Sequence, residues 1–370
     1  MNDSCVEFKN VVKRFPGVTA VDNISLLIPT GKVTSLLGPS GCGKTTALRL
    51  VAGLEAVDSG QILIDKQVVN DIPPYRRECT MVFQNLAVFP HMTVGENIAY
   101  GLHRRKVPKQ EINKRVHEML ALIKLPHISL RYPTQLSGGQ LQRVALARSL
   151  VLKPKILLLD EPLAALDRKL RKEMQIELKR IQREVGITFL YVTHDQKVAL
   201  SISDVIAVMN QGKIVQLGTP IEIFETPRTG FVADFMGASN ILYGTVRSHD
   251  SNNIQLKTRT GLTVMFTISN EMDLKEISGI SVRPEVIHLT SATDDLRVDN
   301  KYEGEVLEVV YQGEFVEVLV CLKDGETILR ANVDSRIHQR HRFAPGVSVQ
   351  AGWNSNRSNI LTVGLVCDNT

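Results

Sequence analysis

The chain has 370 residues and a net charge of +5, from 44 Lys and Arg residues against 39 Asp and Glu residues. This length is enough for two domains, and a content of 43% hydrophobic and 22% charged residues excludes a disordered or membrane-embedded protein. The charge is too small to indicate a nucleic-acid partner, and the longest apolar runs are far shorter than the ~20 residues that cross a bilayer. The five cysteines have no paired spacing, which favours a reducing cytoplasm and disfavours a zinc site.

In chain order, the first informative segment is a glycine-rich loop at residues 38–45, which reads GPSGCGKT. It follows a predicted buried strand at residues 33–37 and precedes a predicted helix at residues 46–52, which is the context of a phosphate-binding loop. Backbone N–H groups in such a loop cradle phosphate oxygens, and the helix dipole attracts the same charge. We expect Lys44 to bridge the β- and γ-phosphates of a nucleotide, and the Thr45 hydroxyl to ligate Mg²⁺.

The stretch from residue 86 to residue 153 has mostly helical periodicity, clearest at residues 110–123 and 140–150. We predict that it forms an inserted helical subdomain. It carries the pentapeptide LSGGQ, in which Ser137 is a good N-cap and the next two glycines leave the first helical N–H groups bare. A capped helix with flexible glycines also explains the pentapeptide taken alone. Its place between the phosphate-binding loop and the next strand favours a second anion site.

A run of apolar residues at 156–159 predicts a strand that is buried on both faces, as in a parallel sheet. Asp160 ends this strand and Glu161 follows it, at the edge where open α/β sheets present their ligands. We expect Asp160 to hold Mg²⁺ through water and Glu161 to polarise or deprotonate a water that attacks the γ-phosphate. Two charges at a strand end are common by themselves, but the upstream loop favours the catalytic interpretation.

The pattern changes twice in the second half of the chain. Residues 168–185 have apolar side chains at helical spacing, with Asp167 as the expected N-cap and Gly186 as the expected C-terminal stop. After residue 240, short β-rich runs replace the helical periodicity. We therefore predict two domains: an α/β domain at residues 1–239, and a small all-β barrel of the oligonucleotide/oligosaccharide-binding (OB) type at residues 240–370.

Taken together, GPSGCGKTT, Gln84, LSGGQ, LLLDEP, Ala165-Leu166-Asp167 and His194 resemble the nucleotide-binding subunit of an ATP-binding cassette (ABC) transporter. The resemblance covers residues 1 to about 240. A looser resemblance, at residues 302–306 and 311–313, links the last third of the chain to the accessory domain of importer ATPases, called the TOBE domain. Together, the two resemblances imply a P-loop α/β domain with an inserted helical subdomain, followed by an OB-like barrel.

The resemblance also implies ATP and Mg²⁺ as cofactors, and it assigns roles to individual residues. Hydrolysis is assigned to Lys44, Gln84, Glu161 and His194, and Mg²⁺ binding to Thr45, Gln84 and Asp160. Nucleotide contacts are assigned to Phe15, Gly38, Pro39, Ser40, Gly41, Cys42, Gly43, Lys44, Thr45, Thr46, Ser137, Gly138, Gly139, Gln140 and Asp167.

Some of these roles have a specific form in the family. Phe15 corresponds to the aromatic that stacks on adenine, although it could also be ordinary core. Gln84 corresponds to the glutamine that senses Mg²⁺ and the transmembrane partner, and His194 to the histidine at the γ-phosphate. Ser137 and its two glycines would contact the nucleotide of the other subunit in a homodimer, and Asp167 would link the two sites.

The implied function is ATP hydrolysis that drives solute import through two separate permease subunits, with an extracytoplasmic solute-binding protein as an indirect partner. The chain would be a peripheral protein on the cytoplasmic face of the inner membrane. Residues 83–94, 174–179 and 193–196 resemble the spermidine/putrescine importer group, although ferric-iron, phosphonate and sugar importers share most of these residues. A soluble cassette ATPase of DNA repair or translation is disfavoured, because the chain has no coiled-coil arms or second cassette. Export is also disfavoured, by analogy alone.

Overall fold

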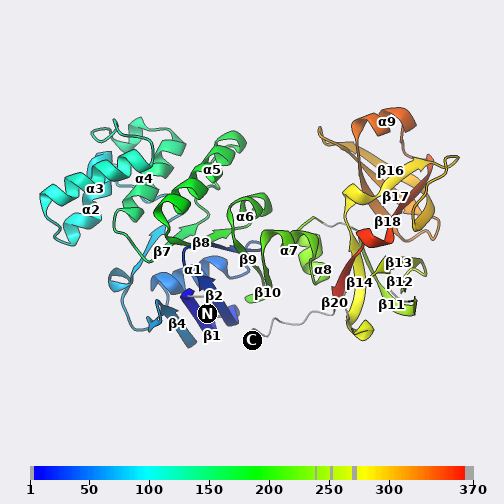
Figure 1. Ribbon diagram of the computed structural model, residues 1–370, viewed down its shortest axis with the longest axis horizontal. Coiled ribbons are helices and arrows are strands. Elements are labelled where there is room, and N and C mark those ends of the chain that lie inside the picture. The colour runs from blue at the N-terminus through cyan, green and yellow to red at the C-terminus, as the bar shows by residue number, and fades with distance from the viewer. Residues whose placement is uncertain (1–3, 238–239, 251–252, 269–272, 363–370) are drawn as a thin grey trace. The chain divides into compact units, whose positions relative to one another are not determined.

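The computed structural model describes the chain except residues 1–3, 238–239, 251–252, 269–272 and 363–370. The described residues form two compact units, which divide after Pro220 (Figure 1). We predicted the boundary near residues 238–240, and residues 238 and 239 lie outside the described residues. Helices α7 (Pro220–Glu225) and α8 (Gly230–Phe235) fall between the two positions. The exact domain limit therefore stays a prediction.

The first unit is built on a six-stranded sheet with the strand order β10-β9-β3-β8-β7-β6. All neighbouring strands are parallel except β10, which runs antiparallel to β9. Every residue of β3, β7 and β8 is buried, which explains why these strands have continuous apolar sequences. The strands are β3 (Val33–Leu37), β6 (Cys79–Val82), β7 (Ile156–Asp160), β8 (Thr188–Thr193), β9 (Val205–Asn210) and β10 (Lys213–Gly218).

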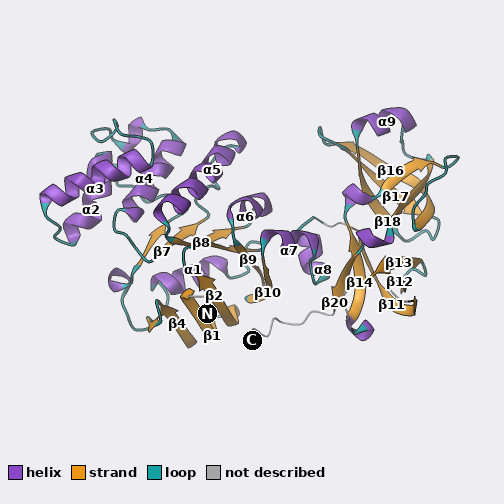
Figure 2. Cartoon of the chain, viewed as in Figure 1, coloured by secondary structure: helices purple, strands orange, loops and turns teal. Residues whose placement is uncertain are grey.

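Two apolar cores cover the two faces of this sheet. Leu157 and Leu159 of β7 face a helical layer, whereas Ile156 and Leu158 face helix α1 (Lys44–Ala52) and a second, antiparallel sheet. The alternation follows from the pleat of a strand. Figure 2 shows these layers on the two sides of the strands. The second sheet has the order β2-β1-β4-β5 and contains β1 (Ser4–Phe15), β2 (Val18–Pro29), β4 (Ser59–Ile64) and β5 (Gln67–Val68).

The helical layer contains the helices that we predicted between β6 and β7. The predicted helix at 110–123 is present as α3, and the one at 140–150 is present as α4, which begins two residues earlier. Helix α2 begins at a complete capping box between Thr93 and Glu96. The layer comprises α2 (Val94–Arg104), α3 (Lys109–Leu122), α4 (Gly138–Leu150), α5 (Arg168–Val185) and α6 (Gln196–Ile202).

The second unit has two five-stranded antiparallel sheets around one apolar core, which includes the fully buried Trp353. The sheets have the orders β13-β12-β11-β14-β20 and β15-β19-β16-β17-β18, and a short helix α9 (Ser335–His341) follows β18. This confirms the predicted fold class, an α/β P-loop unit followed by a small OB-like β unit. The strands are β11 (Asn240–Asp250), β12 (Asn253–Thr258), β13 (Thr263–Thr267), β14 (Ile277–Val282), β15 (His288–Ser291), β16 (Asn300–Tyr311), β17 (Val316–Leu322), β18 (Ile328–Val333), β19 (Ser348–Trp353) and β20 (Asn359–Thr362).

Candidate functional site

Four neighbouring parallel strands bring the predicted site residues to one edge of the six-stranded sheet. Strand β3 leads into the glycine-rich loop, β8 into His194, β7 into Glu161 and β6 into the segment with Gln84. The carboxyl ends of parallel strands share an edge, and that edge is where open α/β sheets bind ligands. Residues as far apart in the chain as Gly38 and His194 are thereby collected at one edge.

The backbone of the loop at residues 38–45 packs so closely against neighbouring segments that two of its positions have no room for a Cβ atom and require glycine. A Cβ at Gly38 would lie 2.2 Å from the Met209 carbonyl oxygen, and a Cβ at Gly43 would lie 2.0 Å from the Ala20 carbonyl oxygen. Gly43 also has a φ of 106° and is the N-cap of α1. Because the first N–H groups of a helix have no partner within it, the start of α1 is an anion site.

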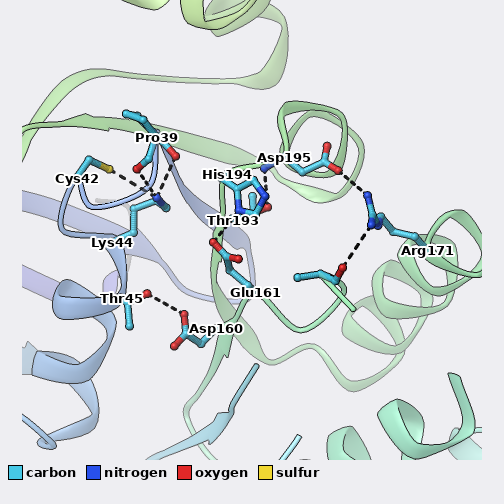
Figure 3. Close-up of polar contacts among 12 residues, drawn as sticks. Pro39, Cys42, Lys44, Thr45, Asp160, Glu161, Arg171, Thr193, His194 and Asp195 are labelled. Carbon is cyan, nitrogen blue, oxygen red and sulfur yellow. Dashed lines mark hydrogen bonds and ion pairs between the residues drawn. The ribbon is translucent and has the colours of Figure 1, made fainter. Parts of the chain in front are cut away.

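The Lys44 side chain is folded back into this loop. It is only 4% exposed, and its Nζ donates hydrogen bonds to the Gly38 carbonyl at 2.9 Å and the Pro39 carbonyl at 2.8 Å (Figure 3). An ammonium held over a ring of backbone groups is placed to meet phosphate oxygens. Cys42 is also buried, and burial raises the pKa of its thiol although Lys44 opposes the shift. Burial thus disfavours the reactive thiolate form of Cys42.

Thr45 and Asp160, two of the three predicted Mg²⁺ ligands, are in contact; the third, Gln84, stays a prediction. The Thr45 Oγ1 donates to the Asp160 Oδ1 at 3.0 Å. Burial raises the pKa of the Asp160 carboxyl, against the hydrogen bond from Thr45. In the described part of the chain no three His, Cys, Asp or Glu side chains group as a metal cage. One carboxylate and one hydroxyl fit Mg²⁺, which keeps several waters and takes phosphate oxygens as further ligands.

Glu161 and His194 form a hydrogen-bonded pair next to this carboxylate. The His194 Nδ1 and the Glu161 Oε1 are 2.9 Å apart (Figure 3), so an ionised Glu161 accepts from the imidazole N–H. Glu161 has a φ of 44°, a left-handed conformation that few residues with a side chain adopt. Strained backbone of this kind persists where surrounding contacts hold it, and it is concentrated at active sites.

The pentapeptide LSGGQ begins helix α4 as predicted. Ser137 is the N-cap, and it exchanges hydrogen bonds with Gln140 in a capping box. A Cβ at Gly139 would lie 2.8 Å from Leu170, so the helix start packs closely on the start of α5. For a Cβ at Gly138, the one described atom within 4 Å belongs to Leu166. The Ser137 side chain is exposed, which leaves the bare helix start open to a ligand from outside.

Phe15 is not part of the core. The residue is 40% exposed at the end of β1, where it pairs with Val18 across the hairpin, and the Lys13 Nζ lies 5.2 Å from the ring centroid. Two residues beyond Val18, the β2 backbone touches the glycine-rich loop at Gly43. The hairpin end, with the partly exposed Phe15, is thus beside the phosphate-binding loop.

The remaining predicted residues are placed as follows. Gln84 is exposed in the loop after β6, and Asp167 is the N-cap of α5, where it accepts from the Leu170 N–H at 2.9 Å. Thr46 lies in the first turn of α1, next to Thr45. Ser40 and Gly41 lie in the exposed part of the phosphate-binding loop.

Two residues at the site were not predicted. Arg171 of α5 and Asp195, which follows His194, form an ion pair at 3.2 Å. Asp195 also caps α6, and an Asp before a helix is a sequence signal that could have indicated it. Nothing in the sequence distinguishes Arg171 from the other basic residues of α5, because its role depends on contacts with segments far away in the chain.

The fold and this edge of the sheet are those of a P-loop nucleotide-binding protein, and comparisons with known proteins agree. A family model described as ABC transporter matches residues 21–164, and one described as TOBE domain matches residues 280–360. The spermidine/putrescine import ATP-binding protein PotA of Thermobifida fusca is 53% identical over 344 residues, which cover 93% of this chain and 88% of that protein. The PotA of Pseudomonas aeruginosa is 44% identical and covers 98% of this chain and 99% of its own.

A solved structure supports the same placement. The cbiO1 protein of Clostridium perfringens, part of the ABC transporter complex cbiONQ, has a TM-score of 0.56 and 32% identity, and the match covers 60% of this chain and 91% of that one. The chain therefore belongs to the ABC transporter family, as one of its ATP-binding, ATP-hydrolysing subunits. Among the described residues, no helix has the length and apolar content to cross a bilayer.

Proposed function

We propose that this chain hydrolyses ATP to drive the import of polyamines, spermidine and putrescine, through separate membrane subunits. The observation that carries the proposal is the shared sheet edge, where Lys44, Asp160 and the Glu161–His194 pair lie together. The choice of solute is supported by the relatives named for spermidine/putrescine import, which are 42% to 53% identical to this chain. Importers of ferric iron, phosphonate or sugars are the alternative.

The chemistry follows from the positions of these side chains. Lys44 and the first N–H groups of α1 would hold the β- and γ-phosphates. Mg²⁺ held by Thr45 and Asp160 would neutralise charge on the phosphate oxygens. Glu161 would take a proton from the attacking water, and the His194 imidazole keeps its carboxylate oriented through the 2.9 Å hydrogen bond.

The site is completed by a second copy of the chain in this proposal. Ser137 and its two glycines form a second anion-binding helix start, which packs on Leu166 and Leu170 rather than on the phosphate-binding loop of its own chain. In a homodimer, the start of α4 in each chain would face the nucleotide that the other chain binds. The phosphate-binding loop and the start of α4 would then both contact nucleotide. Asp167, at the start of α5, would lie at the same interface.

The permease subunits would dock beside Gln84. A cavity of about 570 Å³ is bounded by the strand and loop before Gln84 and by helices α2 and α4. Its wall includes Arg148, whose guanidinium lies 4.1 Å from the Phe89 ring centroid and donates to the Ala87 carbonyl. This surface would hold the chain, as a peripheral protein, on the cytoplasmic face of the inner membrane. A solute-binding protein would meet the permeases only, and no nucleic acid is involved.

Uptake by a reconstituted transporter tests the proposal. The chain and the membrane subunits that co-purify with it are placed in vesicles, and labelled spermidine, putrescine, ferric iron, phosphonate and sugar are offered with ATP. We expect ATP-dependent accumulation of the polyamines only. Glu161→Gln should bind ATP but cut turnover and uptake by roughly 10²–10⁴-fold. Uptake of another solute would overturn the polyamine assignment, and ATP-independent uptake would overturn the ATPase role.

A further inference from the structure

Arg171, on the first turn of α5, is the point where three segments around the site are joined. Its Nη2 donates to the Leu166 carbonyl at 2.9 Å and to the Ala164 carbonyl at 3.4 Å, in the turn that follows Glu161. Its Nη1 donates to the Asp195 carboxylate at 3.2 Å, next to His194. Figure 3 shows Arg171 reaching from its helix toward both segments.

This geometry suits a guanidinium and no other side chain. Arg presents five N–H donors in a rigid, planar fork, so one residue can bind two carbonyls and a carboxylate at once. Lys has a compact ammonium on a flexible stem and cannot span the same three acceptors. The Arg171 Nε is buried without a hydrogen-bond partner in the described structure. Arg171, Glu161 and His194 all line one cavity of about 80 Å³.

The two segments that Arg171 joins carry the reacting pair. Glu161 and His194 leave the sheet from different strands, β7 and β8, and their own direct link is one hydrogen bond of 2.9 Å. Glu161 also has the strained left-handed backbone, which neighbouring contacts must hold in place. Arg171 supplies such contacts on both sides of the pair: to the turn after Glu161 and to the residue after His194.

We propose that Arg171 is a positioning residue for hydrolysis, which holds the Glu161 carboxylate and the His194 imidazole in register through Ala164, Leu166 and Asp195. The inference rests on the proposed function and extends it. Small displacements of a reacting group cost about 10²-fold in rate without a comparable change in substrate binding. Arg171 should therefore affect kcat far more than the KM for ATP, since Lys44 and Phe15 do not contact it.

The test compares Arg171→Met, Arg171→Lys and Asp195→Asn with a control, Lys172→Met, which removes the same charge from the next, exposed position of α5. Arg171→Met should lower kcat roughly 10- to 100-fold and change the KM for ATP less than about threefold. Arg171→Lys should restore only part of the rate. Lys172→Met should leave kcat unchanged, and all four variants should keep a cooperative thermal transition.

A second readout separates positioning from general stability. In a Glu161→Gln background the base is already absent, so Arg171→Met should add less than about threefold to the loss if it acts through Glu161. The inference would be overturned if Arg171→Met lowered kcat by the same factor in the Glu161→Gln background as in the wild type. It would also be overturned if the KM for ATP rose by the same factor as kcat fell. An unchanged kcat in Arg171→Met would overturn it as well. A wild-type chain without ATPase activity would instead overturn the proposed function itself.

Discussion

The Asp160 carboxylate is buried at the end of β7. In the described structure, the one hydrogen bond of its side chain is the one that it accepts from Thr45. Both its position and its neighbour Glu161 were predicted from the apolar run that precedes them. The contact with Thr45 could be expected once both residues were placed at one sheet edge. The hydrogen bond between Glu161 and His194, and the positive φ of Glu161, could not be predicted. Both depend on how β7 and β8 are aligned relative to each other in the sheet.

The raised pKa of Asp160 predicts a cost in stability near neutral pH. An unfolded Asp titrates at about 3.9, and burial raises the pKa of Asp160 in the folded chain. Below the unfolded pKa both states are protonated and there is no cost; the cost appears as the pH rises through the folded pKa. Asp160→Asn should therefore raise the Tm of the nucleotide-free protein at neutral pH, and the gain should shrink toward pH ~4.

Calorimetry across this pH range checks the prediction, with MgATP as the second arm. MgATP should stabilise the wild-type chain much more than Asp160→Asn, because the variant lacks the carboxylate for Mg²⁺. A variant that is less stable than wild type at neutral pH would contradict the burial argument.

Phe15 makes a separate prediction at the residue scale. The residue is partly exposed and lies at a hairpin beside the phosphate-binding loop, so Phe15→Ala should weaken ATP binding by about 1–3 kcal/mol. Phe15→Tyr, which keeps the ring, should bind ATP as wild type does. Titration with ATP and with inorganic triphosphate checks the cause. An equal loss for both ligands would show that Phe15 supports the loop and does not stack on the base.

Helix α4 is the element on which the dimer hypothesis depends. Its N-cap and its C-terminal end followed from the sequence, because Ser-x-x-Gln capping and helical periodicity are local signals. Strands β3 and β7 were equally clear, since strands buried on both faces have unbroken apolar sequences. Their order in the sheet, and the packing of Gly139 against Leu170, are long-range properties that no local pattern contains.

Ser137 allows the anion role of α4 to be separated from its role in folding. Ser137→Asp keeps an N-cap but places a negative charge where a phosphate would bind, so it should be as stable as wild type and inactive. Ser137→Ala should lose about 0.5–2 kcal/mol of stability and keep more activity. Ser137→Arg should also abolish hydrolysis. ATP titration of the dilute, monomeric variants completes the test, because lost binding in the monomer would contradict the trans site.

At the scale of the whole molecule, the catalytic residues that we predicted all belong to the first unit. The helices α7 and α8 belong instead to the second unit, where the Arg283 guanidinium lies 3.4 Å from the Phe224 ring centroid and Asn359 donates to the Pro227 carbonyl. We did not predict these contacts, because the change from helical to β-rich sequence occurs only after α8. The division that the sequence pattern predicts near residue 240 therefore stays a prediction.

Two truncated chains test the separation of the units. A chain that ends at Pro220 and one that ends at Ser239 should both bind MgATP with nearly the affinity of the full chain, since no phosphate-loop or carboxylate pair was predicted after residue 240. The longer one should be the less soluble, because it exposes α7 and α8 without their partners. A large loss of ATP affinity in a truncated chain that is still folded would show that the second unit supplies part of the nucleotide site.

The central claim is that two copies of the chain close over ATP, and that hydrolysis with Glu161 as the base ends the ATP-bound dimer. The most direct measurement is the mass of Glu161→Gln in solution, by light scattering, with and without MgATP. The account predicts a monomer without nucleotide and a stable dimer with MgATP, which adding Ser137→Asp abolishes while each monomer still binds ATP. A Glu161→Gln protein that binds MgATP and stays monomeric would contradict the account.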